Sequence, residues 1–102
     1  MNNARHYVVI YDISHTKTRN KLARFLFEYG IRTQYSVFEV EVKSSQYNKF
    51  ITLLEHKIKY KTDKIYIYAL NKADVKNIKR IGSYEKTFIF NYFIWREDKQ
   101  TL

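Results

Sequence analysis

The stretch from Tyr7 to Ile13 constrains the fold more than any other, because it has the pattern of a strand covered on both faces. Its odd positions, and its even positions as far as Ile10, are all apolar or aromatic, as in a central strand with packing on each side. Asp12 interrupts the even row where the strand should end. A fold built on this strand therefore needs a covering layer on each face.

An amphipathic helix is predicted directly after this strand. The residues from Ser14 to Thr16 are of types that cap helix N-termini. Apolar residues then recur at intervals of three and four, which places them on one face of a helix. Gly30 stands where helices often end in a left-handed residue. The apolar residues of this helix are Leu22, Phe25, Leu26 and Tyr29.

The middle of the chain predicts extended structure and then a second helix. From Ile31 to Val42 the apolar positions change from odd to even at Val37-Phe38, which indicates a bulge, a sharp bend or the junction of two strands. Ser44-Ser45 predicts the start of a second amphipathic helix, which ends in the basic segment Lys57 to Lys61. The apolar residues of this helix are Tyr47, Phe50, Ile51, Leu54 and Ile58.

The last third of the chain predicts two more strands. Asp63 to Leu70 is apolar or aromatic on both faces. Asn71 to Arg80 is polar and basic and predicts a short helix or turn, which Ile81-Gly82-Ser83 breaks. Thr87 to Trp95 predicts a terminal strand, and we expect the charged tail Arg96 to Leu102 to fray.

The two predicted amphipathic helices can cover only one face of such a sheet. The strands around Tyr7, Ile65 and Phe88 are apolar on both faces, so the second face needs another layer. A second copy of the chain is the simplest supplier, and the terminal strand is a candidate for adding to the partner's sheet edge. The pattern therefore predicts a homodimer.

Charge and composition suggest a partner and a compartment. The 102 residues carry 19 Lys and Arg against 10 Asp and Glu, a formal charge of +9, and 18% are aromatic. Such a balance suits a nucleic-acid partner, or a surface that lysine keeps soluble. The absence of cysteine excludes disulfides and thiolate zinc sites and fits a reducing compartment, so we expect a cytoplasmic protein. We expect a single domain over residues 1–102 and no membrane span.

Asp12 is the candidate centre of the chemistry. The three histidines have no metal-ligand spacing, and no nucleophile elbow or glycine-rich phosphate loop is present. A carboxylate at a strand end among basic residues matches Mg²⁺ or Mn²⁺. One carboxylate makes a poor site, but a two-fold dimer would place Asp12 opposite its own copy. The alternative is that Asp12 only begins the turn or caps the helix.

Basic residues of the first helix extend this hypothesis. Arg19 precedes Leu22 and Leu26 on the same helix face, one turn nearer the N-terminus, so it is directed back toward Asp12. Other cations lie on the opposite side and form a basic ridge that either follows phosphates or faces water. This ridge consists of Lys17, Lys21 and Arg24.

These motifs resemble the small CRISPR-associated Cas-two family. The resemblance spans roughly Tyr7 to Trp95 and rests on Tyr11-Asp12-Ile13, on Arg19, on Gly30 and on Gln34-Tyr35-Ser36-Val37-Phe38. It implies an α+β, ferredoxin-like βαββαβ fold with an extra C-terminal strand exchanged across a homodimer. It also implies that Asp12 of each protomer binds one divalent metal, with Tyr11, Arg19, Arg32 and Phe38 as the other site residues.

The chain departs from the family pattern at two places. Lys21 stands where some members have an arginine, so a point charge replaces a bidentate fork. Glu39-Val40 stands where a glycine often follows Val-Phe, which leaves the expected hairpin turn there without its usual residue.

The resemblance implies two candidate functions. One is a metal-dependent endonuclease that hydrolyses single-stranded RNA, double-stranded DNA or both, in which Arg19 and Arg32 clamp phosphates. The other is a non-catalytic dimeric scaffold that binds duplex DNA and bridges the CRISPR integrase, Cas one, during spacer acquisition. A toxin-like ribonuclease on the same fold is a minor alternative.

Overall fold

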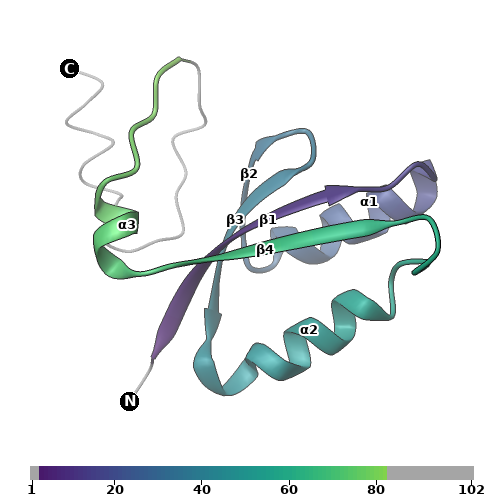
Figure 1. The fold of residues 1–102 in the computed structure, drawn as a ribbon, viewed down its shortest axis with the longest axis horizontal. Coiled ribbons are helices and arrows are strands. Elements are labelled where there is room, and N and C mark those ends of the chain that lie inside the picture. Colours follow the sequence, from purple (N-terminus) through teal and green to yellow (C-terminus); the bar gives the residue numbers. More distant parts are fainter. Residues whose placement is uncertain (1–2, 83–102) are drawn as a thin grey trace.

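The computed structural model describes residues 3–82 of the chain (Figure 1). The predicted terminal strand Thr87 to Trp95 and the tail Arg96 to Leu102 lie outside the described residues. The elements follow in the order β1 (Ala4–Asp12), α1 (Thr16–Phe27), β2 (Gly30–Gln34), β3 (Val37–Lys43), a 3₁₀ turn η1 (Ser44–Gln46), α2 (Tyr47–Glu55), β4 (Lys64–Leu70) and α3 (Lys72–Lys76).

Within residues 3–82, the strands form one antiparallel sheet in the order β2-β3-β1-β4. β1 lies between β3 and β4 and pairs with both along nearly its whole length. A β-α-β-β-α-β chain whose first and third strands are neighbours has the ferredoxin-like arrangement, so the predicted fold class is confirmed. Asp12 lies at the end of β1, directly opposite Lys64, the first residue of β4.

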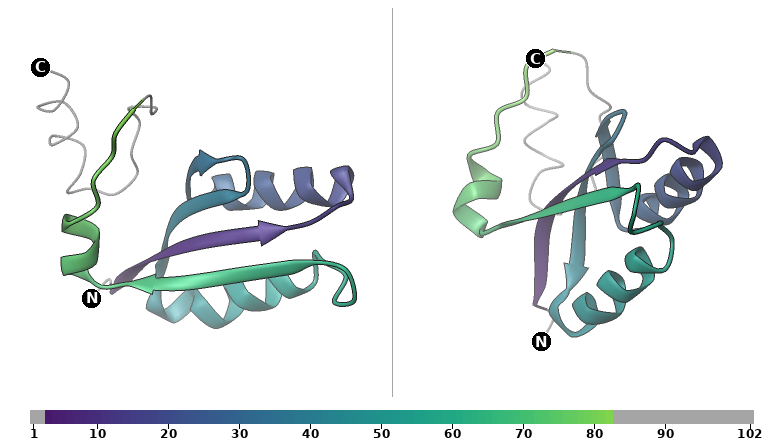
Figure 2. Two further views of the ribbon diagram at one scale, coloured as in Figure 1. Left: turned by 45° about the horizontal axis from the view of Figure 1, so that its top comes forward. Right: turned by 45° about the vertical axis from the view of Figure 1, so that its right-hand side comes forward.

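The hydrophobic core lies between the sheet and the helices α1 and α2, which both pack on one face of it (Figure 2). The predicted apolar stripes of both helices point into this core, with Phe25 stacked on Phe50 at 5.8 Å between ring centroids. Burying each large apolar side chain contributes about 1.5–3 kcal/mol. The buried residues are Tyr7, Val9, Tyr11, Ile13, Leu22, Ala23, Leu26, Phe38, Val40, Val42, Phe50 and Leu54.

The opposite face of the sheet is covered only at one end. There Val75 of α3 is fully buried against Ile31, Leu70 and Ile78. Elsewhere on this face the even residues of β4 are half exposed, and Tyr66 stacks on Tyr68 at 6.5 Å. The prediction that the two amphipathic helices cover a single face is therefore confirmed. None of the helices within residues 3–82 has the length and apolar character needed to cross a membrane.

Gly30 has a different role from the one predicted. α1 is capped by Glu28, and Gly30 is already the first residue of β2, with no positive φ. A Cβ at this position would overlap the carbonyl group of Glu39 and lie 2.7 Å from Val40 Cα. Gly30 is therefore required because the backbones of β2 and β3 approach closely, and the expectation of a left-handed helix end was wrong.

The change of phase at Val37-Phe38 is the junction of two strands. β2 ends at Gln34 and β3 begins at Val37, with a turn at Tyr35-Ser36 and a register shift between Arg32 and Gln34. Glu39-Val40 lies inside β3, so the hairpin turn expected just after Val37-Phe38 was misplaced.

The second helix is shorter than predicted. α2 ends at Glu55, and the basic segment Lys57 to Lys61 lies in the connection that leads to β4. Ile58 nevertheless packs on the core from this connection, which explains why it fits the apolar pattern of the helix. α3 confirms the predicted short helix, and a capping box between Asn71 and Asp74 starts it.

Candidate metal and nucleic-acid site

Asp12 ends β1 on the face of the sheet that α1 and α2 leave open. Its neighbour Tyr11 belongs to the buried core, and successive residues of a strand point to opposite faces. Asp12 is exposed, and its cross-strand partner Lys64 shares its face. The structure thus places an accessible carboxylate beside a cation at one end of the sheet.

Arg19 holds the loop that follows Asp12. Its Nη1 donates to the carbonyl oxygens of Ile13 and Ser14, both at 3.0 Å, and its Nη2 donates to the hydroxyl of Thr16 at 3.1 Å. The His15 side chain accepts from the backbone N–H of Thr18 and caps α1. The predicted direction of Arg19, back along the helix toward the end of β1, therefore agrees with its contacts, which are with the loop.

Tyr11, Arg32 and Phe38 meet on the other face of the sheet, on the side of the helices. The Tyr11 hydroxyl donates to the Tyr35 carbonyl at 3.2 Å and accepts from Arg32 Nη2 at 3.4 Å. The guanidinium carbon of Arg32 lies 5.3 Å from the ring centroid of Phe38 and 5.5 Å from that of Phe27. This cluster is an arginine held rigidly by a hydroxyl and two rings, and the sheet separates it from the face of Asp12.

The basic ridge on α1 is exposed as predicted. Lys17, Lys21 and Arg24 are all exposed on the helix, at spacings of four and three residues. The ridge begins in the first turn of α1, close along the chain to Asp12. Its position suits contacts with phosphates that extend along the helix away from the end of β1.

Two residues of this region were not predicted from the sequence. Phe27 packs edge-on against Phe38, with 4.9 Å between centroids, and carries Arg32 on its face. Lys64 lies opposite Asp12. The signal for Lys64 is its place at the start of a strand, but only the pairing of β4 with β1 turns that place into a neighbour of Asp12.

One chain supplies only part of a metal site. Among residues 3–82, no group of three or more His, Cys, Asp or Glu side chains is arranged to hold a metal ion. Asp12 offers exposed carboxylate oxygens, which Mg²⁺ and Mn²⁺ prefer. The donor set therefore fits a divalent cation as a half-site, which a second Asp12 would complete.

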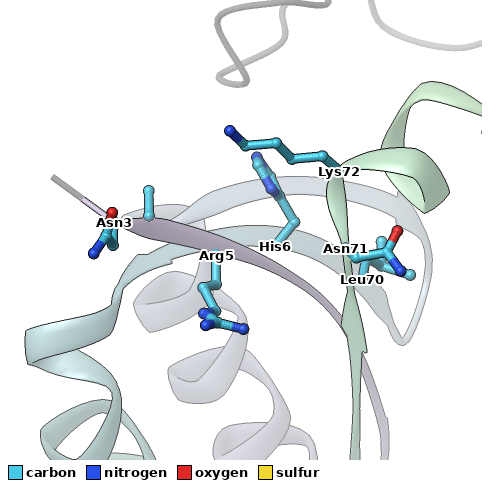
Figure 3. A pocket seen from close by; sticks show the side chains of 7 residues that line it. Asn3, Arg5, His6, Leu70, Asn71 and Lys72 are labelled. Atoms are coloured by element: carbon cyan, nitrogen blue, oxygen red, sulfur yellow. The ribbon is translucent and has the colours of Figure 1, made fainter.

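A pocket of about 310 Å³ lies at the other end of the sheet (Figure 3). His6 and Arg5 point to opposite sides of β1, and Lys72 and Asn71 come from the start of α3. Burial lowers the pKa of His6 and raises the pKa of Glu41, whose carboxylate lies 3.7 Å from His6 Nε2. These shifted groups lie far along β1 from Asp12 and belong to the packing of the sheet.

The fold and the site define a class of protein: a small ferredoxin-like domain with an exposed carboxylate at the end of its central strand and a basic ridge on the following helix. A family model described as CRISPR associated protein Cas2 matches residues 5–78. The chain belongs to this family, and the resemblance drawn from the motifs around Asp12 is confirmed.

Individual relatives agree with this assignment. The chain is 45% identical over 62 residues to the CRISPR-associated endoribonuclease Cas2 4 of Rhodospirillum rubrum, across 61% of this chain and 50% of that relative. It is 36% identical over 81 residues to the CRISPR-associated endoribonuclease Cas2 1 of Synechocystis, across 76% of this chain and 86% of that relative. The match to the first of these thus spans half of the relative's length.

A solved structure has the same fold. The chain resembles a chain in a partial Cas6-RT-Cas1–Cas2 complex with a TM-score of 0.65 and 37% identity. The similarity covers 76% of this chain and 84% of that chain. The shared region therefore includes most of the ferredoxin-like unit described above.

Proposed function

We propose that this chain is a metal-dependent endonuclease of CRISPR adaptation, which hydrolyses phosphodiester bonds in single-stranded RNA, double-stranded DNA or both. The observation that carries the proposal is the exposed Asp12 at the end of β1, on the face that the helices leave open. The relatives named as CRISPR-associated endoribonucleases support it. The reducing compartment that suits a chain without cysteine is the cytoplasm, where this activity would operate.

In this proposal two copies of Asp12, one from each protomer of a homodimer, hold one Mg²⁺ or Mn²⁺. A bound divalent cation supplies a polarised phosphate oxygen and a water of lowered pKa. Asp12 contributes negative charge and oxygen ligands, and Arg19 fixes the loop that carries it. Arg19 Nη1 uses both of its hydrogens on that loop, so only the rest of its guanidinium remains for a phosphate.

Arg32 and the basic ridge bind the nucleic acid in this proposal. Tyr11 and the rings of Phe27 and Phe38 hold the Arg32 guanidinium in one orientation, which lowers the entropy lost when it binds a phosphate. The ridge of Lys17, Lys21 and Arg24 extends the phosphate contacts along α1.

Cleavage assays with Asp12→Asn test the proposal. Labelled single-stranded RNA and duplex DNA are incubated with each protein in Mg²⁺ or in EDTA. We expect wild-type cleavage in Mg²⁺ and only the EDTA background for Asp12→Asn, because the amide removes the charge with little change of shape. Glu28→Gln, which removes an exposed carboxylate at the far end of α1, is the matched control and should cleave normally. Undiminished cleavage by Asp12→Asn would place the activity elsewhere or in a contaminant.

A second candidate is the non-catalytic scaffold, in which the dimer binds duplex DNA and bridges the CRISPR integrase. The similarity to a chain in a complex that contains Cas1 favours it. The same assay separates the two functions: absence of cleavage, together with duplex binding that weakens steeply as salt rises, supports the scaffold.

A further inference from the structure

The end of the sheet that carries Asp12 lies between two exposed tyrosines. Tyr35 is 92% exposed and Tyr60 is 75% exposed, the highest values among the aromatic side chains of residues 3–82. Isolated tyrosines with this much apolar surface in water need no partner for folding. Their common location is the observation that requires an explanation.

The hairpin of Tyr35 is fastened directly beside Asp12. The backbone N–H of Tyr11 donates to the Ser36 carbonyl at 3.0 Å, and the Tyr11 hydroxyl donates to the Tyr35 carbonyl. The turn therefore lies one strand away from the end of β1, on the side of β3. Strands in a sheet are about 4.8 Å apart, so Tyr35 lies within the span of one or two nucleotides from Asp12.

Tyr60 lies on the other side of Asp12, in the connection between α2 and β4. This connection leads directly to Lys64, the cross-strand partner of Asp12 (Figure 1). The buried Asp63 orders it, accepting from the Lys59 backbone N–H at 2.9 Å and from the Thr62 hydroxyl at 3.1 Å. The backbone N–H of Asp63 also donates to the Lys59 carbonyl at 2.8 Å. Tyr60 is therefore presented to solvent by a structured loop.

Exposed lysines surround Tyr60. Lys59 and Lys61 flank it in the chain, and Lys64 follows at the start of β4; all three are exposed. Lys57 differs, because its ammonium lies 4.8 Å from the centroid of the Phe25 ring and anchors the loop to α1. The loop thus combines one exposed ring with adjacent positive charges and has no acidic side chain on its exposed surface.

We propose that Tyr35, Tyr60, Lys59 and Lys61 form a binding surface for single-stranded nucleic acid that crosses the end of the sheet at Asp12. Rings that bases stack on, together with cations that bind the backbone, are the features of single-strand recognition. A duplex keeps its bases stacked inside and would leave both rings unused. This surface rests on the proposed function and names the substrate class that Asp12 would receive, single-stranded RNA or DNA.

Binding measured in EDTA tests the surface separately from cleavage. The probe is a fluorescein-labelled oligouridylate, and its affinity is read by fluorescence anisotropy. We expect Tyr60→Ala to weaken binding by about 5- to 100-fold, the range for loss of one stacked base, and Tyr60→Phe to bind like the wild type. Binding of a duplex DNA probe should not change in either variant. Because Tyr60 is exposed, thermal melting should show that both variants fold.

The lysines are tested by the salt dependence of the same binding. The double variant Lys59→Gln, Lys61→Gln should reduce the slope of log affinity against log salt by about 1.4, because each phosphate contact with a single strand contributes about 0.7. The matched control is Lys43→Gln, Lys49→Gln, which removes two exposed lysines at the opposite end of the molecule and should leave the slope unchanged.

Wild-type affinity for oligouridylate in Tyr60→Ala, or equal losses for single strand and duplex, would overturn the surface. These outcomes are independent of the fate of the endonuclease proposal. If the variants lose single-strand binding as expected but the wild type does not cleave in Mg²⁺, the surface is upheld and the nuclease assignment fails. If cleavage depends on Asp12 while Tyr60→Ala binds normally, the nuclease assignment is upheld and the surface fails.

Discussion

Adjacent residues of β1 serve opposite faces of the sheet, and this division explains most of the candidate site at the scale of single residues. Tyr11 lies in the core and supports Arg32, whereas Asp12 lies on the open face beside Lys64. The alternation of apolar residues up to Ile10 was sufficient to predict that Asp12 differs from its row. The neighbours Lys64 and Phe27 depend on strand pairing and helix packing, which no local pattern contains.

His6 makes the stability of the chain sensitive to pH. Burial lowers its pKa below the ordinary 6.5, although the Glu41 carboxylate is near, so desolvation outweighs that attraction. The unfolded chain therefore binds more protons than the folded one just below pH 6.5, and stability falls as pH is lowered through this range. Burial raises the pKa of Glu41 above 4.5, and this contribution has the opposite sign, because the folded state then binds more protons.

We expect His6→Gln to flatten the decline of stability below pH 6.5. The slope should decrease by at most about 1.4 kcal/mol per pH unit, the limit for one proton. Urea unfolding at several pH values and one protein concentration measures it. His56→Gln, which replaces an exposed histidine, is the control and should keep the wild-type slope. An unchanged slope in His6→Gln would show that His6 does not link folding to protons.

The segment after α3 is fastened to β3 by an ion pair, a link visible only at the scale of elements. Arg80 Nη1 donates to one carboxylate oxygen of Glu39 at 2.8 Å, and Nη2 donates to the other. Both side chains are nearly buried. The sequence predicted a helix or turn at Asn71 to Arg80 but could not predict this contact, because it joins residues 41 positions apart.

Breaking this pair should destabilise the fold. We expect Glu39→Gln to lower the free energy of unfolding by about 3 kcal/mol, because the Arg80 guanidinium then stays buried without its counter-charge. The double variant Glu39→Leu, Arg80→Met should recover much of the loss, since it removes both charges. Chemical denaturation measures each value, with Glu55→Gln, at an exposed carboxylate, as the control. A loss no larger than that of the control would mean that the pair does not stabilise the chain.

At the scale of the whole molecule, the sheet has one face with too little cover. The sequence predicted this from strands that are apolar on both sides, and α1 and α2 indeed lie together on one face (Figure 2). Tyr66 and Tyr68 remain half exposed on the other face, the one that carries Asp12. The position of the hairpin turn was not predictable in this way, because Tyr35-Ser36 contains neither glycine nor proline to mark it.

A homodimer that covers this face would complete the fold and the metal site together. We expect light scattering at micromolar concentration to give the mass of two 12.5 kDa chains for the wild type and of one chain for Tyr68→Glu, because a carboxylate there would be buried in the interface. Tyr68 is 52% exposed in the single chain, so the substitution should spare the core. Thr52→Glu, on the outer surface of α2, adds the same charge and should remain dimeric.

The same variants connect assembly to chemistry. If two copies of Asp12 share one cation, Tyr68→Glu should lose Mn²⁺ binding in isothermal titration even though its own Asp12 is intact, while Thr52→Glu should bind Mn²⁺ as the wild type does. A wild-type monomer at micromolar concentration would contradict the dimer. A monomeric Tyr68→Glu that still binds Mn²⁺ at full affinity would show that Asp12 does not need its copy, because a half-site with one carboxylate would then be sufficient.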